Sequence, residues 1–307
     1  ATPGAATQPA PGREAPENSG RCRPAPNVLS VRAMDAATFY VRYLLAPTTL
    51  AAAGCTLAVL LSRLAEPLGG HAPTASLIGA LSVSGAWIVL WEQLRPAEGV
   101  WARRSPDQRR GDVRYIALTS AGVVACARLV TWIGAVAGAS PSGPSIAAWP
   151  LALQISLTVA SAELITYSLH WASHRRSPWL WRLHAIHHRP EGLSLRSGSR
   201  VHPFENLYTL LALAPAAALG ATPEAIVASF AYQLVVGALQ HADLDIRLGA
   251  FNWIVPGPEM HRIHHHIDGA VAENYSLNLP ALDLLFGTTA PCHGPGEVRM
   301  GVAGERD

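Results

Sequence analysis

The chain of 307 residues contains no lysine and few charged residues of any kind. Charged side chains make up 14% of it, whereas soluble domains carry about a quarter. The formal net charge of +2 is too small to suggest nucleic-acid binding. Half of the residues are hydrophobic and the mean hydropathy is positive. The composition therefore predicts a membrane protein.

Cysteine is scarce, and the common cofactor motifs are absent. The four cysteines (Cys22, Cys55, Cys126 and Cys292) lie far apart without a CxxC pair, which argues against a zinc knuckle or a disulfide framework. The chain has no iron–sulfur cysteine run, no GxGxxG fingerprint and no HPGG-type haem segment. Any redox chemistry would therefore need electrons from a separate protein.

Four long apolar runs are present, at residues 43–62, 74–91, 115–139 and 149–162. Twenty such residues form a helix of about 30 Å, which is enough to cross a bilayer. Arg128 interrupts the third run and should face the protein interior or snorkel to an interface. Two shorter runs, 207–221 and 223–239, favour a short membrane hairpin. A soluble all-α protein with buried helices is the alternative.

The arginines orient these spans. Segments 95–114 and 175–200 carry six arginines each, whereas 138–145 carries none. The positive-inside tendency places both Arg-rich segments in the cytoplasm. The predicted fold is an all-α polytopic membrane protein with about four transmembrane helices, a short membrane hairpin and a cytoplasmic histidine-rich cap. The arginine and alanine bias suggests a bacterial protein, and hence the inner membrane.

Three regions are expected along the chain. Residues 1–38 are rich in Ala, Pro and Gly and predict a disordered tail without a cleaved secretory signal. Residues 39–290 form the membrane domain, and 291–307 form a flexible C-terminal tail.

Eleven of the thirteen histidines fall between residues 170 and 266, in ordered clusters. They form one HxxxH (His170, His174) and two HxxHH triplets (His184, His187, His188; His261, His264, His265), with His266 appended. Positions i, i+3 and i+4 share a helix face, so each triplet is expected to aim at one point. Eight imidazoles exceed what one metal takes, which predicts a pair of ions. Imidazole suits Zn, Cu, Fe and Ni.

This order of motifs among hydrophobic spans resembles the fatty acid hydroxylase/sterol desaturase superfamily of membrane di-iron oxygenases. The resemblance covers roughly residues 90–290 and extends to flanking elements. These are Glu163-x3-Tyr167-x2-His170, Arg200-x-His202-Pro203-x-Glu205, Gln240-His241-x-Asp243, Asn274-Tyr275 and the segment 282–288. The chain has Glu163 and Asp243 where Asp and Asn are more usual in the family.

The resemblance implies a helical membrane anchor, a cytoplasmic histidine cap and O2-dependent oxidation of a lipid C–H bond. Two iron ions (Fe2+/Fe3+) would be held by the eight motif histidines and by His241, which ends the apolar hairpin. Iron is preferred over zinc because zinc has no redox chemistry, although the ligands alone would accept zinc. Hydroxylation would consume O2, two electrons and two protons and release water. The electrons would come from a ferredoxin, a cytochrome or a reductase.

Side chains around the imidazoles should matter, because neutral ligands leave two divalent ions uncompensated and carboxylates on the distal ring nitrogens orient histidines. Glu163 and Tyr167 share a helix face with His170, and Glu163 is the first candidate for that role. Its alternative role is to end the apolar span. The remaining candidates for metal binding or for contact with the ligands are His202, Glu205, Asp243, Asp245, Asp268 and Asn274. Asp245 stands where some relatives carry a further histidine. His266 should point elsewhere.

Several functions remain open at this stage. A lipid hydroxylase is the first hypothesis. A desaturase, a sterol C-4 methyl or C-5 oxidase, a carotenoid hydroxylase, or an ether-lipid or ornithine-lipid oxygenase would use the same site. A haem-carrying electron-transfer protein and a non-catalytic metal-binding scaffold are alternatives of other classes.

Overall fold

The computed structural model describes residues 35–138, 145–267, 273–290 and 298–304. Within them every regular element is helical, and a single isolated bridge pairs His266 with Met300. The elements are α2 (Ala36–Phe39), η1 (Tyr40–Leu44), α3 (Leu45–Leu68), η2 (Gly69–His71), α4 (Ala72–Leu94), α5 (Val100–Arg103), α6 (Pro106–Gly138), α7 (Leu151–Arg175), α8 (Pro178–His188), α9 (Leu195–Gly198), η3 (Pro203–Glu205), α10 (Asn206–Ala218), α11 (Pro223–Gln240), η4 (Gly249–Trp253), α12 (Pro258–His264) and α13 (Ala281–Phe286).

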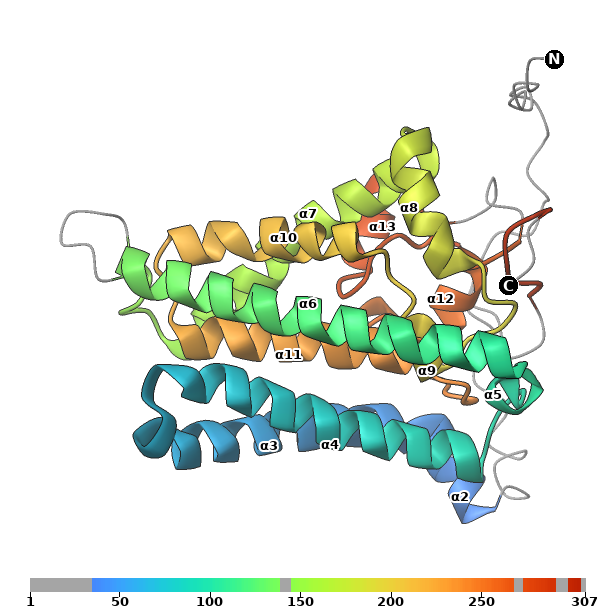
Figure 1. Ribbon diagram of the computed structural model, residues 1–307, viewed down its shortest axis with the longest axis horizontal. Coiled ribbons are helices and arrows are strands. Elements are labelled where there is room, and N and C mark those ends of the chain that lie inside the picture. Colours follow the sequence, from blue (N-terminus) through green and yellow to red (C-terminus); the bar gives the residue numbers. More distant parts are fainter. Residues whose placement is uncertain (1–34, 139–144, 268–272, 291–297, 305–307) are drawn as a thin grey trace.

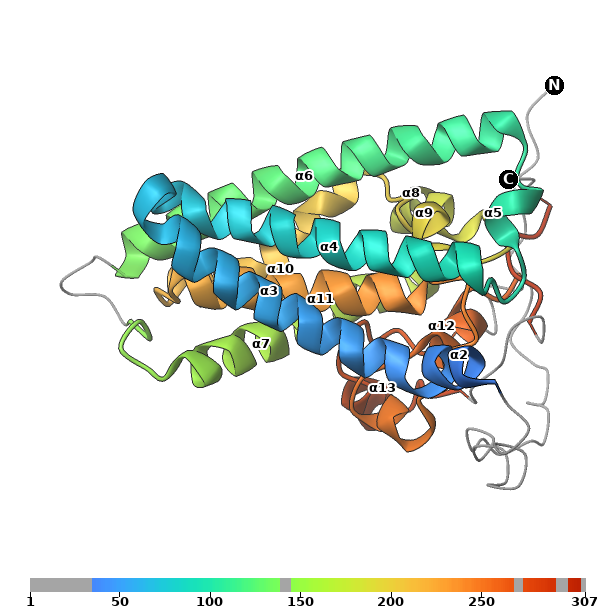
Figure 2. The ribbon, with the colours of Figure 1, turned by 90° about the horizontal axis from the view of Figure 1, so that it is seen from below.

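The long helices form an elongated bundle, and the short ones gather toward one end of it (Figures 1 and 2). α3 and α4 run back along each other, and α10 and α11 form a second hairpin that packs against α6 and α7. α5, α8, α9 and α12 lie at the end of the bundle opposite the α3–α4 turn. This end is called the cap below.

Local sequence signals set the turns of the bundle. Gly69 has φ +48° where α3 ends, a left-handed conformation that glycine adopts without steric penalty. Thr222 caps α11 by accepting a hydrogen bond from the backbone N–H of Ala225 at 3.3 Å, and Pro223 follows at the first helical position. The chain thus reverses sharply between α10 and α11.

Three helical stretches of the described chain are long and apolar enough to cross a membrane: Ala36–Leu94, Pro106–Val136 and Leu151–Arg175. The first contains both α3 and α4, so the four predicted long apolar runs correspond to α3, α4, α6 and α7. Large apolar side chains such as Val83, Leu118 and Leu153 are exposed on these helices, as expected for lipid contact. The all-α polytopic fold predicted from the sequence is confirmed.

The core between the helices is built largely from small residues. Ala127, Ala162, Ala217 and Ala221 are fully buried where α6, α7 and the α10–α11 hairpin meet. Small side chains let helix backbones approach closely, which is the usual way helices associate inside a membrane.

The ends of the chain lie partly outside the described residues. Of the predicted N-terminal tail 1–38, only residues 35–38 are described, and Ala36 begins α2. Of the predicted C-terminal tail 291–307, residues 298–304 are described, and they contact the cap. The Ile267 N–H donates to the Arg299 carbonyl at 2.8 Å, and Val298 and Met300 pack on Leu193.

Candidate metal centre

Four short stretches of the cap end of the bundle deliver the motif histidines. The last turns of α7 carry His170 and His174, and α8 carries the first HxxHH triplet. The second triplet lies on α12 and its C-cap residue, and His241 is the C-cap residue of α11. Ser177, which accepts from the Leu180 N–H at 3.2 Å, and Pro178 start α8 directly after α7, so the two helices fold back toward a common point.

The structure brings all nine predicted ligands into two groups. The first contains His170, His174, His184, His188 and His264, and the second contains His187, His241, His261 and His265. Within each group the candidate ligand nitrogens all lie within 4.8 Å of one another. Eight of the nine histidines are buried, and His174 is half-buried.

Each HxxHH triplet is divided between the two groups. On α8, His184 and His188 join the first group and His187 joins the second. On α12 the order is reversed, because His261 and His265 join the second group and His264 joins the first. Positions i and i+4 lie about 40° apart around a helix, whereas i+3 lies about 100° from i+4. The expectation that each triplet meets at one point is therefore wrong.

Hydrogen-bond acceptors fix the tautomers of two histidines of the first group. His170 donates from Nδ1 to the Tyr275 carbonyl at 2.7 Å, and His184 donates from Nδ1 to the Glu205 carboxylate at 3.0 Å. In the neutral form of each ring the lone pair is therefore on Nε2, and the two Nε2 atoms face each other at 3.1 Å. Two acceptors in contact repel each other unless a cation lies between them.

In the second group, too, a lone pair on Nε2 faces other ring nitrogens. His241 donates from Nδ1 to the Gly237 carbonyl at 2.8 Å, which leaves a lone pair on Nε2. That atom lies 3.0 Å from Nε2 of both His187 and His261. Nitrogens bound at right angles to one metal ion, with bonds of about 2.1 Å, lie about 3.0 Å apart. The ligand set of both groups therefore fits a metal ion.

Burial keeps these ligands neutral. Loss of hydration, followed by the neighbouring histidines, holds the pKa values of His187, His188, His261, His264 and His265 well below the usual 6.5. Burial also lowers the pKa of His241 to about 4. Only a neutral imidazole can bind a metal ion, so burial holds these six histidines in the binding form at neutral pH.

Of the two acidic candidates, Glu205 takes the role that was expected first of Glu163. Glu163 does not contact an imidazole; its carboxylate accepts from the Leu277 N–H at 2.7 Å and from the Asn278 amide at 2.8 Å. Glu205 instead accepts from His184, as described above. Tyr167 bonds the Thr288 hydroxyl at 2.8 Å. Glu163 and Tyr167 thus hold the closing segment 273–290 against α7.

Of the remaining candidates, Asp268 lies outside the described residues, and the others lie outside both groups. The His202 Nδ1 accepts from the Phe204 N–H at 3.1 Å and starts η3. Asp243 accepts from the backbone N–H groups of Glu98 and Val100, and Asp245 pairs with Arg42 and Arg247.

Asn274 and His266 complete the set. Asn274 has φ +58° and holds Ala290 through its side-chain oxygen at 2.8 Å. His266 belongs to neither histidine group and pairs through its backbone with Met300.

Sequence reasoning missed the backbone groups that hold the ligands. Carbonyls of Tyr275, Gly237 and Glu273 accept from His170, His241 and His264. Gly198 was also missed. It leaves space for the His241 ring, because a Cβ at this position would lie 2.5 Å from Cγ of His241. The position of Gly237 four residues before His241 is the one signal that could have indicated its carbonyl.

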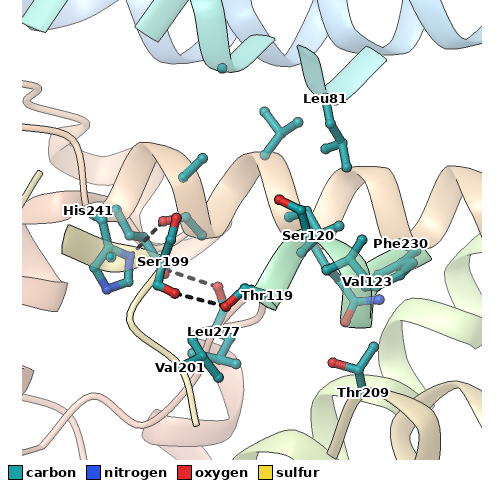
Figure 3. A pocket seen from close by; sticks show the side chains of 18 of the residues that line it. Leu81, Thr119, Ser120, Val123, Ser199, Val201, Thr209, Phe230, His241 and Leu277 are labelled. Carbon is teal, nitrogen blue, oxygen red and sulfur yellow. Dashed lines mark hydrogen bonds between the residues drawn. The ribbon is translucent and has the colours of Figure 1, made fainter. Parts of the chain in front are cut away.

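A cavity of about 620 Å³ leads from the histidines into the bundle. Ligands of both groups line it, among them His170, His184, His187, His241 and His261. Its other walls are α4, α6, α10 and α11, and Figure 3 shows Leu81, Ser120, Thr209 and Phe230 around it. The Thr119 hydroxyl on the same wall donates to the Ser199 carbonyl at 2.9 Å. The wall is mainly apolar.

Comparison with known proteins agrees with this geometry. A family model described as fatty acid hydroxylase matches residues 155–288. The ornithine lipid hydroxylase OlsE of Rhizobium tropici is 31% identical over 232 residues, covering 72% of this chain and 69% of that protein. This chain belongs to the fatty acid hydroxylase family. The matched residues of this family member include all nine clustered histidines.

A second relative and the solved structures complete the comparison. The alkylglycerol monooxygenase of Xenopus tropicalis is 26% identical over 136 residues, covering 44% of this chain and 30% of that protein. No solved structure matches this fatty acid hydroxylase family member significantly.

Proposed function

We propose that the protein is an integral membrane di-iron oxygenase that hydroxylates a lipid C–H bond with O2 and external electrons. The observation that carries this proposal is the convergence of nine histidines in two groups at the end of a lipid-sized cavity. The family supplies the reaction type, since the relatives are a lipid hydroxylase and a monooxygenase of alkylglycerols.

Bound iron would supply the redox chemistry that activates O2, which zinc cannot do. The chain's own residues hold the ligands in the binding tautomer. Glu205 and the Tyr275 carbonyl keep the protons of His184 and His170 on Nδ1, so both Nε2 lone pairs face inward. Among the described residues, Glu205 is the acidic side chain hydrogen-bonded to a clustered histidine, and it would offset part of the metal charge.

The cavity supports a lipid as substrate. Its apolar walls are formed by α4, α6, α10 and α11, and the stretches that contain α4 and α6 are long and apolar enough to span the bilayer. An acyl or alkyl chain can therefore reach it sideways from the membrane without crossing water. The histidines at its cap end would meet the reacting carbon.

The redox partner and the orientation are part of the same proposal. Arg-rich segments 95–114 and 175–200 contain α5, α8 and α9 of the cap, so the positive-inside tendency would put the cap on the cytoplasmic side of a bacterial inner membrane. Electrons would come from a soluble or membrane-bound ferredoxin, cytochrome or reductase. Exposed arginines such as Arg103, Arg110 and Arg182 would favour an acidic donor.

The geometry argues against the haem alternative. Five imidazoles surround the first site and four surround the second, which leaves no room for the four pyrrole nitrogens of a porphyrin. Hydroxylation and desaturation use the same centre, and the two relatives' activities favour hydroxylation.

The test combines metal analysis with lipid mass spectrometry. Purified protein should contain iron and show no Soret band, and cells that express it should gain lipids heavier by one oxygen atom. His187→Ala should abolish these lipids, because it removes a ligand of the second site. Lipids lighter by two hydrogens would indicate a desaturase, and unchanged lipids in both strains would contradict the proposal.

A further inference from the structure

Arg128 is the single charged residue of residues 115–138 of α6. Within the described chain its side chain makes one hydrogen bond, from Nη2 to Nδ1 of His71 at 3.4 Å. A guanidinium only donates, so His71 accepts through Nδ1 and keeps a proton on Nε2. Both side chains therefore present N–H donors to their surroundings.

Both residues line a second cavity, of about 600 Å³, where η2 and the first residues of α4 and α11 meet α6. It lies at the end of the bundle opposite the cap, beside the α3–α4 turn. It also contains Glu224, which is the first-turn acid of α11, and Trp132. Trp132 lies one turn after Arg128 on α6 and is 64% exposed.

Arg128 and Glu224 bring charges of opposite sign to this cavity. The structure shows no ion pair for Arg128 or Glu224 among the residues that it describes, although they line the same cavity. A charge at membrane depth is stabilised by an opposite charge or by the interface. An exposed Trp beside it is typical of the headgroup level of a bilayer. The cavity thus lies where lipid headgroups lie.

We propose that this second cavity binds the headgroup of a zwitterionic amino lipid such as phosphatidylethanolamine. Arg128 and Nε2–H of His71 bind the phosphate, and Glu224 binds the primary ammonium. Charges of both signs in one cavity match this headgroup better than that of a purely anionic lipid. The site lies at the far end of the bundle from the histidines, so its occupant is distinct from the lipid that reacts.

The experiment measures thermal unfolding of the full chain in detergent, with one added lipid at a time. Phosphatidylethanolamine should raise Tm by about 5 °C at saturation, with smaller shifts from phosphatidylglycerol and phosphatidylcholine. Arg128→Gln should remove the shift. Glu224→Gln should make the shifts by phosphatidylethanolamine and phosphatidylglycerol equal.

The matched controls are Arg63→Gln and Glu66→Gln. Both residues are exposed charges near the C-terminal end of α3, at the same end of the bundle, and neither lines the cavity. Both should retain the wild-type shifts. Analysis of co-purified lipid provides a second readout, in which Arg128→Gln should lose the retained phosphatidylethanolamine. Equal shifts from all three lipids, a larger shift from phosphatidylglycerol, or an equal effect of soluble phosphoethanolamine would overturn the proposal.

Discussion

Individual ligands in the cap are oriented by what their second ring nitrogen touches. Where the partner is a side chain, as for His184 and Glu205, a substitution can remove it and leave the ligand in place. Where the partner is a backbone carbonyl, as for His170 and His241, no substitution reaches it directly. Glu205 is therefore the point at which the first site can be perturbed without deleting a ligand.

Glu205→Gln should weaken metal binding at the first site by about 10-fold to 100-fold. The amide keeps the shape of the side chain but replaces the charged acceptor that holds the His184 proton on Nδ1. The measurement is metal content after dialysis against a graded chelator. Glu191→Gln, at an exposed position, is the control, and an unchanged metal content in Glu205→Gln would contradict this role.

The histidines at 265 and 266 provide a second residue-scale prediction. His265→Ala should reduce hydroxylation strongly, because His265 belongs to the second site, whereas His266→Ala should have a much smaller effect. The measurement is product formation per mole of enzyme. Equal losses for the two variants would show that His266 also serves the centre.

At the scale of elements, the sequence predicted much of the architecture. The four apolar runs correspond to α3, α4, α6 and α7, and they could be predicted because the length of an apolar run is a local property of the sequence. The sequence motifs also identified the nine histidines that cluster. The roles of Glu163 and Glu205 could not be predicted, because they depend on where the closing segment and η3 fold against α7 and α8. The sequence spacing puts Glu163 on the same helix face as His170. Its carboxylate, however, accepts hydrogen bonds from Leu277 and Asn278 of the packed closing segment.

The contact between α7 and the closing segment predicts a stability effect. Glu163→Ala would leave the buried Asn278 amide and Leu277 N–H without an acceptor, which costs about 1–3 kcal/mol. Tm in detergent should fall by several degrees, and metal content should fall with it, because Tyr275 holds His170. Glu163→Gln keeps one acceptor oxygen, so its Tm and metal content should lie between those of the wild type and of Glu163→Ala. An unchanged Tm in Glu163→Ala would show that the segment is held elsewhere.

At the scale of the whole molecule, acid should destabilise the metal-free protein. Unfolded histidines have a pKa near 6.5, whereas the folded pKa of His241 is about 4. The unfolded state therefore binds more protons below pH 6.5, and stability falls as pH drops from about 6.5 to 4. His241 alone contributes about 3 kcal/mol over this range. Thermal unfolding of chelator-treated protein at several pH values measures it, and a flat profile would contradict the buried neutral state.

The cavity that joins the bundle to the cap predicts how access can be blocked. Ser120→Trp places an indole in the cavity between α4 and α6 and should lower kcat/KM at least about tenfold, equivalent to about 1.4 kcal/mol. Metal content should stay at the wild-type level. Leu118→Trp on the same helix, at a position 53% exposed, is the matched control. Equal kinetics in the two variants would place the substrate elsewhere.

Because each HxxHH triplet is divided between the two groups, α8 and α12 each carry histidines of both groups. A shift of either helix as a body therefore moves candidate ligands of both groups together. An ion bound at one group would orient the helices that also carry the histidines of the other group, so metal uptake is expected to be cooperative.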